Sequence, residues 1–234
     1  MIVVNGDSFV HEYHLPEEQR WSKGIGADLN LALGGGSNDS TFQTTIECLN
    51  NNDVKTLILG WTRWERTYFN KANGSRYKIV SDSAIDEFLG DSHNDKDVVE
   101  FYYNKVFNEY TQLKNMLIHM LHIQDYCRLK KIKLINFATV FGKNDLSTTE
   151  LTKIAKSAYM SKETKDMEQM GIKYNQGILS DYILRLDPDT WVDREVFASM
   201  KQKLKDFATV DLMGHIGIDG SKRWAEILKE QINR

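Results

Sequence analysis

The strongest constraint on the fold is an alternation of short apolar runs with helical segments. Apolar runs at 2–5, 29–33 and 54–60 each end in glycine and polar residues, and each is followed by a segment with helical signals. A fourth run lies at 133–139. Strands that alternate with helices in this way are typical of a parallel sheet covered by helices and joined by right-handed crossovers. The sequence therefore predicts an α/β protein in which these four runs form one sheet.

The helical segments are expected from apolar spacing and from their start signals. The longest begins near residue 96, because apolar residues recur there at every third or fourth position up to residue 130. The stretch 68–95 is expected to be largely irregular. We interpret residues 1–234 as a single domain and 141–187, which is polar and only partly helical, as an insertion or cap over the sheet edge. The predicted helices are 17–27, 41–49, 96–130, 149–160, 162–170, 191–207 and 221–234.

Composition narrows the class of partner. The net charge of −3 and the isoelectric point near 6.1 give no general attraction to nucleic acid or to an anionic membrane. No basic leader precedes the first strand, and no apolar run approaches the length that spans a bilayer. We therefore expect a cytoplasmic protein without a nucleic-acid or membrane partner, and we make no prediction of its oligomeric state. Cys48 and Cys127 are expected to be buried free thiols.

The first strand runs directly into Gly6, Asp7 and Ser8. In open α/β folds, ligands bind in crevices at the carboxyl ends of the strands, so this turn would present the Ser8 hydroxyl where a substrate binds. The alternative is that Asp7 and Ser8 only cap the next helix, because both are favoured N-cap residues.

Two further motifs complete a pattern. Glycines at 34–36 followed by Ser37 and Asn38 come after the second strand, and His215 stands just before the last helix with Asp211 four residues earlier. In this order the motifs resemble those of the SGNH (GDSL-like) hydrolase superfamily, and the resemblance extends over the whole chain. It implies a three-layer α/β/α sandwich with a flavodoxin-like parallel sheet. It also implies ester hydrolysis without a cofactor.

The resemblance assigns a role to each motif. Ser8 is the nucleophile, His215 the base and Asp211 the acid, although the family places the acid three residues before the histidine rather than four. A serine hydroxyl needs such a base to become a nucleophile, and a carboxylate behind the base fixes its tautomer.

The resemblance also implies backbone N–H donors to the oxyanion at Ser8 and Gly35. Thr62 stands where the family has an asparagine. Asn38 lies within a Gly-x-Asn-Asp motif like that of the family, but this motif follows the second strand instead of the third. Thr62 and Asn38 are therefore rival third donors.

Other residues near the strand ends are candidate substrate contacts. These are Asp7, Trp61 and Arg63, with a buried aromatic core and a solvated charged face as the alternatives. The run from Gly60 through Arg63 resembles a phage-encoded variant of the family. His119 and His122 lie three apart on the long helix, but the sequence offers no third ligand, so no metal is expected.

The predicted function is that of a serine ester hydrolase acting on a small-molecule ester, with an O-acyl group of a carbohydrate as the favoured substrate. Two alternatives stay open. The departures from the family pattern fit a binding protein whose site has decayed. An acyltransferase would use the same serine and the same covalent intermediate.

Overall fold

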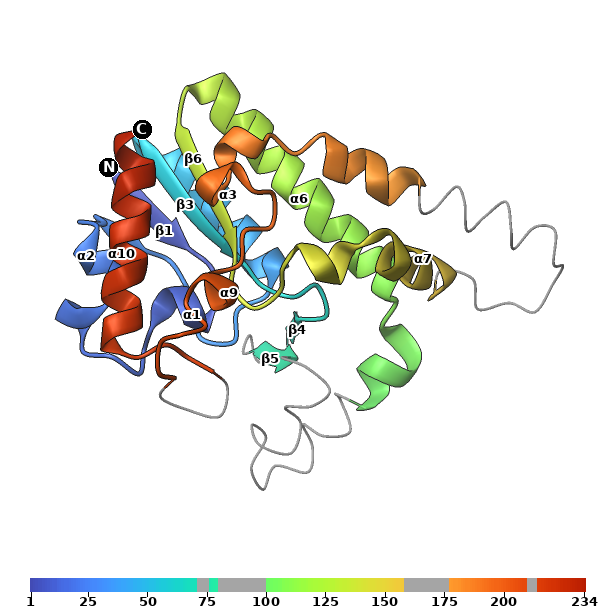
Figure 1. Ribbon diagram of the computed structural model, residues 1–234. Helices are drawn as coiled ribbons and strands as arrows, with labels where there is room; N and C mark the ends of the chain where they lie inside the picture. The colour runs from blue at the N-terminus through green and yellow to red at the C-terminus, as the bar shows by residue number, and fades with distance from the viewer. Residues whose placement is uncertain (71–75, 80–99, 158–176, 210–213) are drawn as a thin grey trace, which may run out of the picture.

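The fold is a parallel four-stranded sheet with helices on both faces (Figure 1). The computed structural model describes residues 1–70, 76–79, 100–157, 177–209 and 214–234. The strands run in the order β2-β1-β3-β6, which is the flavodoxin-like order 2-1-3-4, and all neighbours are parallel. Their bounds are β1 Ile2–Asn5, β2 Leu29–Asn30, β3 Thr56–Trp61 and β6 Lys133–Ala138.

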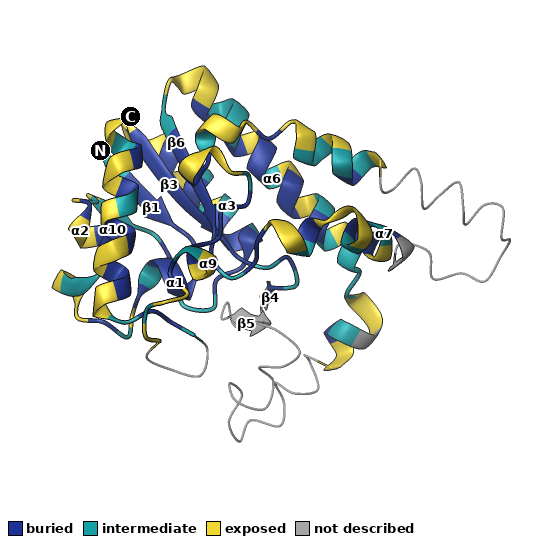
Figure 2. Cartoon of the chain, viewed as in Figure 1, coloured by how far each residue is buried: buried dark blue, intermediate teal, exposed yellow. Residues whose placement is uncertain are grey.

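Each face of the sheet has its own hydrophobic core, which gives the three layers (Figure 2). Along β3, Leu57 and Leu59 belong to the core beneath α3 and α6, whereas Ile58 belongs to the core beneath α2 and α10. Side chains alternate across a strand, so a strand covered on both faces is apolar at every position. The helices that form the two layers are α3 Asn38–Asn51 and α6 Glu109–Lys130 on one face and α2 Trp21–Gly24 and α10 Ile218–Asn233 on the other. The predicted three-layer α/β sandwich is confirmed.

Strand bounds differ from the prediction mainly at β2. This strand has two residues instead of the expected five, because the Asn30 side-chain oxygen accepts the Ala32 N–H and turns the chain. Residues 31–33 nevertheless stay beside β1, since Leu31 and Leu33 donate backbone hydrogen bonds to it and its extension.

Two predicted helices begin elsewhere because a cap decides the start. α3 begins at Asn38 rather than at residue 41, since Ser37 is the N-cap and forms a capping box with Ser40. The helix expected from residue 96 is interrupted by a π-helical turn, η3 Tyr102–Val106. It restarts as α6 after Asn108, whose side chain accepts the Thr111 N–H. The last helix, α10, begins at Ile218, three residues earlier than predicted.

The helix expected at 17–27 is also broken. A 3₁₀ turn, η1 Glu17–Gln19, and the four-residue α2 replace it, because Arg20 between them is extended. Gly24 of α2 packs so closely against α10 that an added Cβ would lie 2.9 Å from the Ala225 Cβ.

The helix predicted at 191–207 is wrong. The segment forms two 3₁₀ turns, η5 Pro188–Thr190 and η6 Val192–Arg194, and a short α9 Met200–Lys203. Trp191 and Ser199 make parallel bridges to β6, so the chain follows the edge of the sheet instead of coiling. Phe197, with φ +65°, is one of the left-handed residues that let it do so.

The predicted insertion at 141–187 is helical where it is described. It contains η4 Lys143–Leu146, α7 Thr148–Ser157, which packs against α6, and helical residues from 177 to 184. The helix predicted at 162–170 lies outside the described residues. A β-hairpin of β4 Thr67–Asn70 and β5 Arg76–Ile79 occupies part of the stretch that was expected to be irregular.

No helix in the described ranges combines the length and the apolarity needed to cross a bilayer.

Candidate active site

The turn after β1 places Ser8 at the carboxyl edge of the sheet. Asp7 caps the short helix α1 Ser8–His11, because its Oδ1 accepts the Phe9 N–H at 3.0 Å. Gly6 has no room for a side chain, since an added Cβ would lie 2.7 Å from the Gly60 carbonyl oxygen. The close approach of β1 and β3 at Gly6 therefore fixes the position of the helix that begins at Ser8.

His215 faces Ser8 across this edge. Its Nε2 lies 2.9 Å from the Ser8 Oγ, and both side chains are buried. In the tautomer that carries the proton on Nδ1, Nε2 accepts the hydroxyl proton of Ser8. The Phe9 ring packs on the imidazole with a centroid distance of 4.6 Å. This geometry would allow an imidazole to take the proton of a hydroxyl.

A second histidine supports the first. His14 donates from Nε2 to the Ile216 carbonyl oxygen at 2.9 Å, and its ring lies 5.0 Å from that of His215. Tyr13 contacts the same imidazole edge-on at 5.7 Å. Sequence reasoning missed these contacts, because 202 residues separate His14 from Ile216 and no local spacing indicates the pair.

Asp7 is held by charge and by a hydroxyl. Its Oδ2 accepts from Arg66 Nη1 at 2.8 Å and from Thr139 Oγ1 at 3.1 Å, with the Asp7 side chain fully buried. Arg66 and Thr139 follow β3 and β6, so the ion pair and the hydroxyl hydrogen bond together connect three strand ends. This placement gives no support to the expected substrate contact by Asp7.

Trp61 and Arg63 also differ from simple substrate contacts. Trp61 is fully buried and donates from Nε1 to the Asn136 Oδ1 at 2.9 Å, which makes it a core residue. Arg63 is half-buried, binds Glu65 through Nε and Nη2, and lies over the Trp64 ring. The Trp61 indole and the Arg63 guanidinium are thus both engaged with neighbouring side chains.

The two rival oxyanion donors are joined to each other. Asn38 Nδ2 donates to the Thr62 carbonyl oxygen at 2.9 Å, and the Thr62 N–H donates to Asn38 Oδ1 at 3.0 Å. The Thr62 Oγ1 is buried and has no hydrogen-bond partner among the described residues. The Asn38 amide thus holds the β3 terminus, and the Thr62 hydroxyl is left for another partner.

The glycine loop lies against the serine turn. The Gly36 N–H closes a turn to the Leu33 carbonyl oxygen, and Gly35 within it has φ +67°, a conformation that favours glycine. A Cβ on Gly36 would lie 3.2 Å from the Gly6 carbonyl oxygen. The loop therefore brings the backbone of Gly36, which directly follows Gly35, next to the turn that carries Ser8.

A buried acid lies at the other end of α1. Glu12 has φ +50°, and its N–H donates to the Ser8 carbonyl oxygen at 2.9 Å, which ends the helix. Its Oε2 accepts the Trp21 N–H at 2.7 Å. Burial raises the pKa of Glu12 from 4.5 to about 8.

The predicted acid, Asp211, lies outside the described residues. Within the described ranges, no three histidine, cysteine or acidic side chains are grouped so that they could hold a metal ion. His119 and His122, considered as a metal pair, both pack against the Phe42 ring instead.

The comparisons identify the fold. No family model and no curated protein matches the sequence. Among solved structures, that of TesA has a TM-score of 0.50 at 8% identity, with 99% of this chain and 97% of that chain covered. The psychrotrophic esterase EstA from Pseudoalteromonas sp., inhibited by monoethylphosphonate, has a TM-score of 0.46 at 9% identity, covering 99% and 96% of the two chains. A GDSL-like lipase from Bacteroides thetaiotaomicron has a TM-score of 0.45 at 12% identity, covering 99% and 87%. At these identities the likeness to TesA shows a shared fold.

Proposed function

We propose that the chain is a serine ester hydrolase of the SGNH type that acts on a small-molecule ester, with an O-acyl carbohydrate as the favoured class. The observation that carries this proposal is the 2.9 Å contact between Ser8 Oγ and His215 Nε2 at the carboxyl edge of the sheet. Ser8 and His215 are 207 residues apart in the sequence, and both side chains lose their hydration when they are buried together. This loss costs free energy, which supports a functional role for the pair.

Ser8 Oγ attacks the ester carbonyl carbon while its proton moves to His215 Nε2. The C–O bond to the alcohol then breaks, and the imidazolium returns its proton to the leaving alkoxide. A water molecule, deprotonated by the same nitrogen, then attacks the acyl-serine; the bond from the acyl carbon to Ser8 Oγ breaks, the imidazolium returns its proton to Ser8 Oγ, and the acid is released. We assign to Asp211 the role of fixing the His215 tautomer, as the family pattern implies.

Three donors serve the oxyanion in this proposal. They are the backbone N–H groups of Ser8 and Gly35 and the hydroxyl of Thr62. We favour Thr62 over Asn38, because the Asn38 amide is engaged with the Thr62 main chain in both directions whereas the Thr62 hydroxyl lacks a partner among the described residues. Asn38 then positions the donor rather than acting as one.

The test uses p-nitrophenyl acetate and an alkyl fluorophosphonate. Wild-type protein should hydrolyse the ester, and mass spectrometry should find the phosphonate on Ser8. Ser8→Ala and His215→Ala should both abolish turnover, because each removes one partner of the proton transfer. Ser22→Ala, which removes a buried serine hydroxyl on α2, is the matched control for loss of a hydroxyl. A wild-type protein that neither turns over the ester nor reacts at Ser8 would overturn the proposal.

A further inference from the structure

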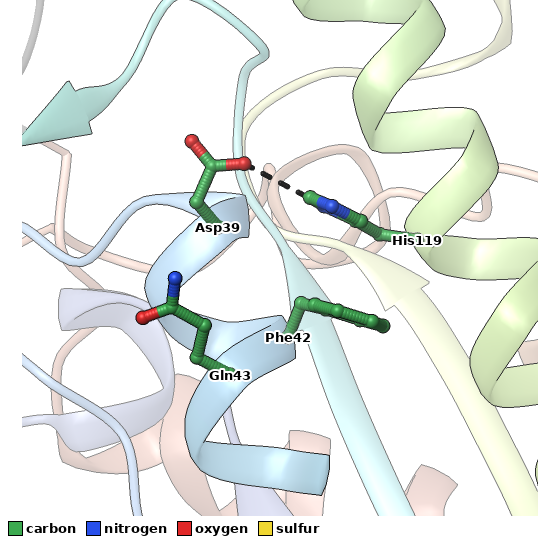
Figure 3. Close-up of a pocket in the computed structure, with 4 residues that line it drawn as sticks. All are labelled: Asp39, Phe42, Gln43 and His119. Atoms are coloured by element: carbon green, nitrogen blue, oxygen red, sulfur yellow. Dashed lines mark ion pairs between the residues drawn. The ribbon is translucent and has the colours of Figure 1, made fainter.

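A cavity of about 320 Å³ lies between α3 and α6, outside the Ser8–His215 pair (Figure 3). The described residues that line it are Asp39, Phe42, Gln43 and His119. Asp39 directly follows Asn38, whose side chain binds the Thr62 main chain, so the cavity adjoins the carboxyl edge of the sheet. The volume is at the lower end of the range for small-molecule sites, roughly 300–1,000 Å³, and suits one ring with its substituents.

The imidazole in this cavity is orientated before any ligand arrives. The His119 ring stacks on the Phe42 ring at 4.2 Å, with 9° between the planes. Its Nδ1 is buried and lies 3.6 Å from Asp39 Oδ1, which is too long for a hydrogen bond but directs this edge of the ring toward the carboxylate. Nε2 is then the nitrogen that remains for a ligand.

The charge of the described lining disfavours anionic ligands. Burial lowers the pKa of His119 below its ordinary value of 6.5, so the imidazole is neutral at pH 7. Burial also raises the pKa of the Asp39 carboxyl, although its side chain is 34% exposed. Among the described residues, the lining thus offers a carboxylate and a neutral imidazole as acceptors and includes no cation that would attract a phosphate or an acid.

The other polar group is the Gln43 amide. Asp39 and Gln43 are four residues apart and project from successive turns of α3 (Figure 3). A carboxylate, an amide and an imidazole nitrogen around one small cavity match the alternating hydroxyls of a sugar ring, each of which can donate and accept. The Phe42 ring, which also lines the cavity, supplies an apolar wall for the C–H groups of such a ring.

We propose that this cavity is a subsite for a neutral pyranose ring. Ring hydroxyls donate to the Asp39 carboxylate and to His119 Nε2, and the Gln43 amide completes the contacts. The further step, that this ring belongs to the alcohol part of the ester, rests on the proposed function.

Binding is tested on full-length Ser8→Ala protein, which cannot turn over an ester. The probes are methyl β-D-glucopyranoside and methyl β-D-xylopyranoside, followed by ¹⁵N chemical shifts of the backbone and of the His119 ring. Both should shift the Asp39, Gln43 and His119 signals and saturate at millimolar concentration. Tetramethylammonium and cyclohexanol are comparison probes. If either of these binds in place of the pyranosides, or if no probe shifts these signals, the proposal fails.

Variants then locate the contact. His119→Phe keeps the stack on Phe42 but removes the nitrogen acceptor, and Asp39→Ala removes the carboxylate. Each should weaken pyranoside binding about tenfold or more, the usual scale for one lost hydrogen bond to a charged or buried group. His122→Phe is the matched control, because His122 lies on the same helix and touches Phe42 edge-on at 5.4 Å but does not line the cavity.

Kinetics connect the subsite to the ester. With a mono-O-acetyl methyl β-D-xylopyranoside, His119→Phe should raise KM about tenfold more than it does with p-nitrophenyl acetate, which has no sugar. Equal effects on the two substrates would show that the bound sugar is not part of the ester. If wild-type protein hydrolyses neither ester, the proposed function fails, whereas the binding result for the subsite is decided independently.

Discussion

At the scale of single residues, the Thr62 hydroxyl is the sharpest test of the oxyanion assignment. Thr62→Val keeps the shape of the side chain and removes only the donor, and it leaves the main-chain bonds to Asn38 in place. Loss of one oxyanion donor typically costs about 10²–10³ in kcat, and the threonine hydroxyl is a weak donor, so we expect a loss of about 10²-fold. Thermal stability should stay near the wild-type value, because the hydroxyl has no partner among the described residues.

Steady-state kinetics with p-nitrophenyl acetate decide this prediction. Thr152→Val on the exposed face of α7 is the control for the same substitution. A Thr62→Val variant with wild-type kcat would remove Thr62 from the oxyanion site and return Asn38 to consideration.

The role of Asp211, which is inferred from the sequence, is also tested with a single substitution. If its carboxylate fixes the His215 tautomer, Asp211→Asn should lower kcat by about 10⁴-fold, as in serine–histidine–aspartate enzymes generally. Circular dichroism should show an intact fold. Near-normal activity would mean a serine–histidine pair in which another group holds the imidazole.

At the scale of elements, the ion pair between Asp7 and Arg66 locks the end of β1 to the segment after β3. Both side chains are almost fully buried, so removing one partner leaves an uncompensated charge. Such a loss costs about 3–5 kcal/mol, whereas exposed pairs contribute about 0–1 kcal/mol. Arg66→Met should therefore lower the free energy of unfolding by about 3 kcal/mol or more.

Urea unfolding of four variants measures this difference: Arg66→Met, Asp7→Asn, their double variant and a control. Arg63→Met is the matched control, because Arg63 pairs with Glu65 in a partly exposed position and should cost about 1 kcal/mol or less. In the double variant with Asp7→Asn, the losses should be less than additive. Additive losses would show that the two charges do not stabilise each other.

The elements also show what a sequence can and cannot predict. β1, β3 and β6 were predicted because strands buried on both faces are apolar runs, and this periodicity is local. The segment 191–207 was misread as a helix, because its bridges to β6 and the left-handed Phe197 depend on packing against the sheet. Helical propensity is a weak prior where tertiary contacts compete with it.

The candidate site likewise has parts that local sequence motifs predict and parts that depend on tertiary packing. The Gly6–Ser8 turn and His215 carry motifs in the sequence, and the structure brings Ser8 and His215 within hydrogen-bond distance. The partners of Asp7 carry no motif, since Arg66 and Thr139 lie 59 and 132 residues away. Only the strand order brings them to one edge.

At the scale of the whole molecule, stability should fall as pH rises, because of Glu12. Its folded-state pKa is about 8, and its ordinary value is 4.5. Between these values the folded protein holds a proton that the unfolded chain has released, so the free energy of unfolding decreases with pH. The contribution is fully present below about pH 4.5 and is lost as pH rises to about 8. One pKa unit corresponds to about 1.4 kcal/mol, so the total is on the order of a few kcal/mol.

Glu12→Gln tests this directly, since glutamine resembles the protonated acid. Urea unfolding should give similar stabilities for the two proteins at pH 5, and the variant should be the more stable at pH 9. Glu17→Gln is the control, because Glu17 is exposed and pairs with Lys23 at the surface. Parallel stability curves for wild type and Glu12→Gln would show that Glu12 is ionised in the folded protein at neutral pH. Glu12 ends the helix that begins with Ser8, so ionisation of Glu12 should also affect activity. The temperature at which wild-type protein loses esterase activity should fall between pH 7 and pH 9. In Glu12→Gln this temperature should stay constant over the same range.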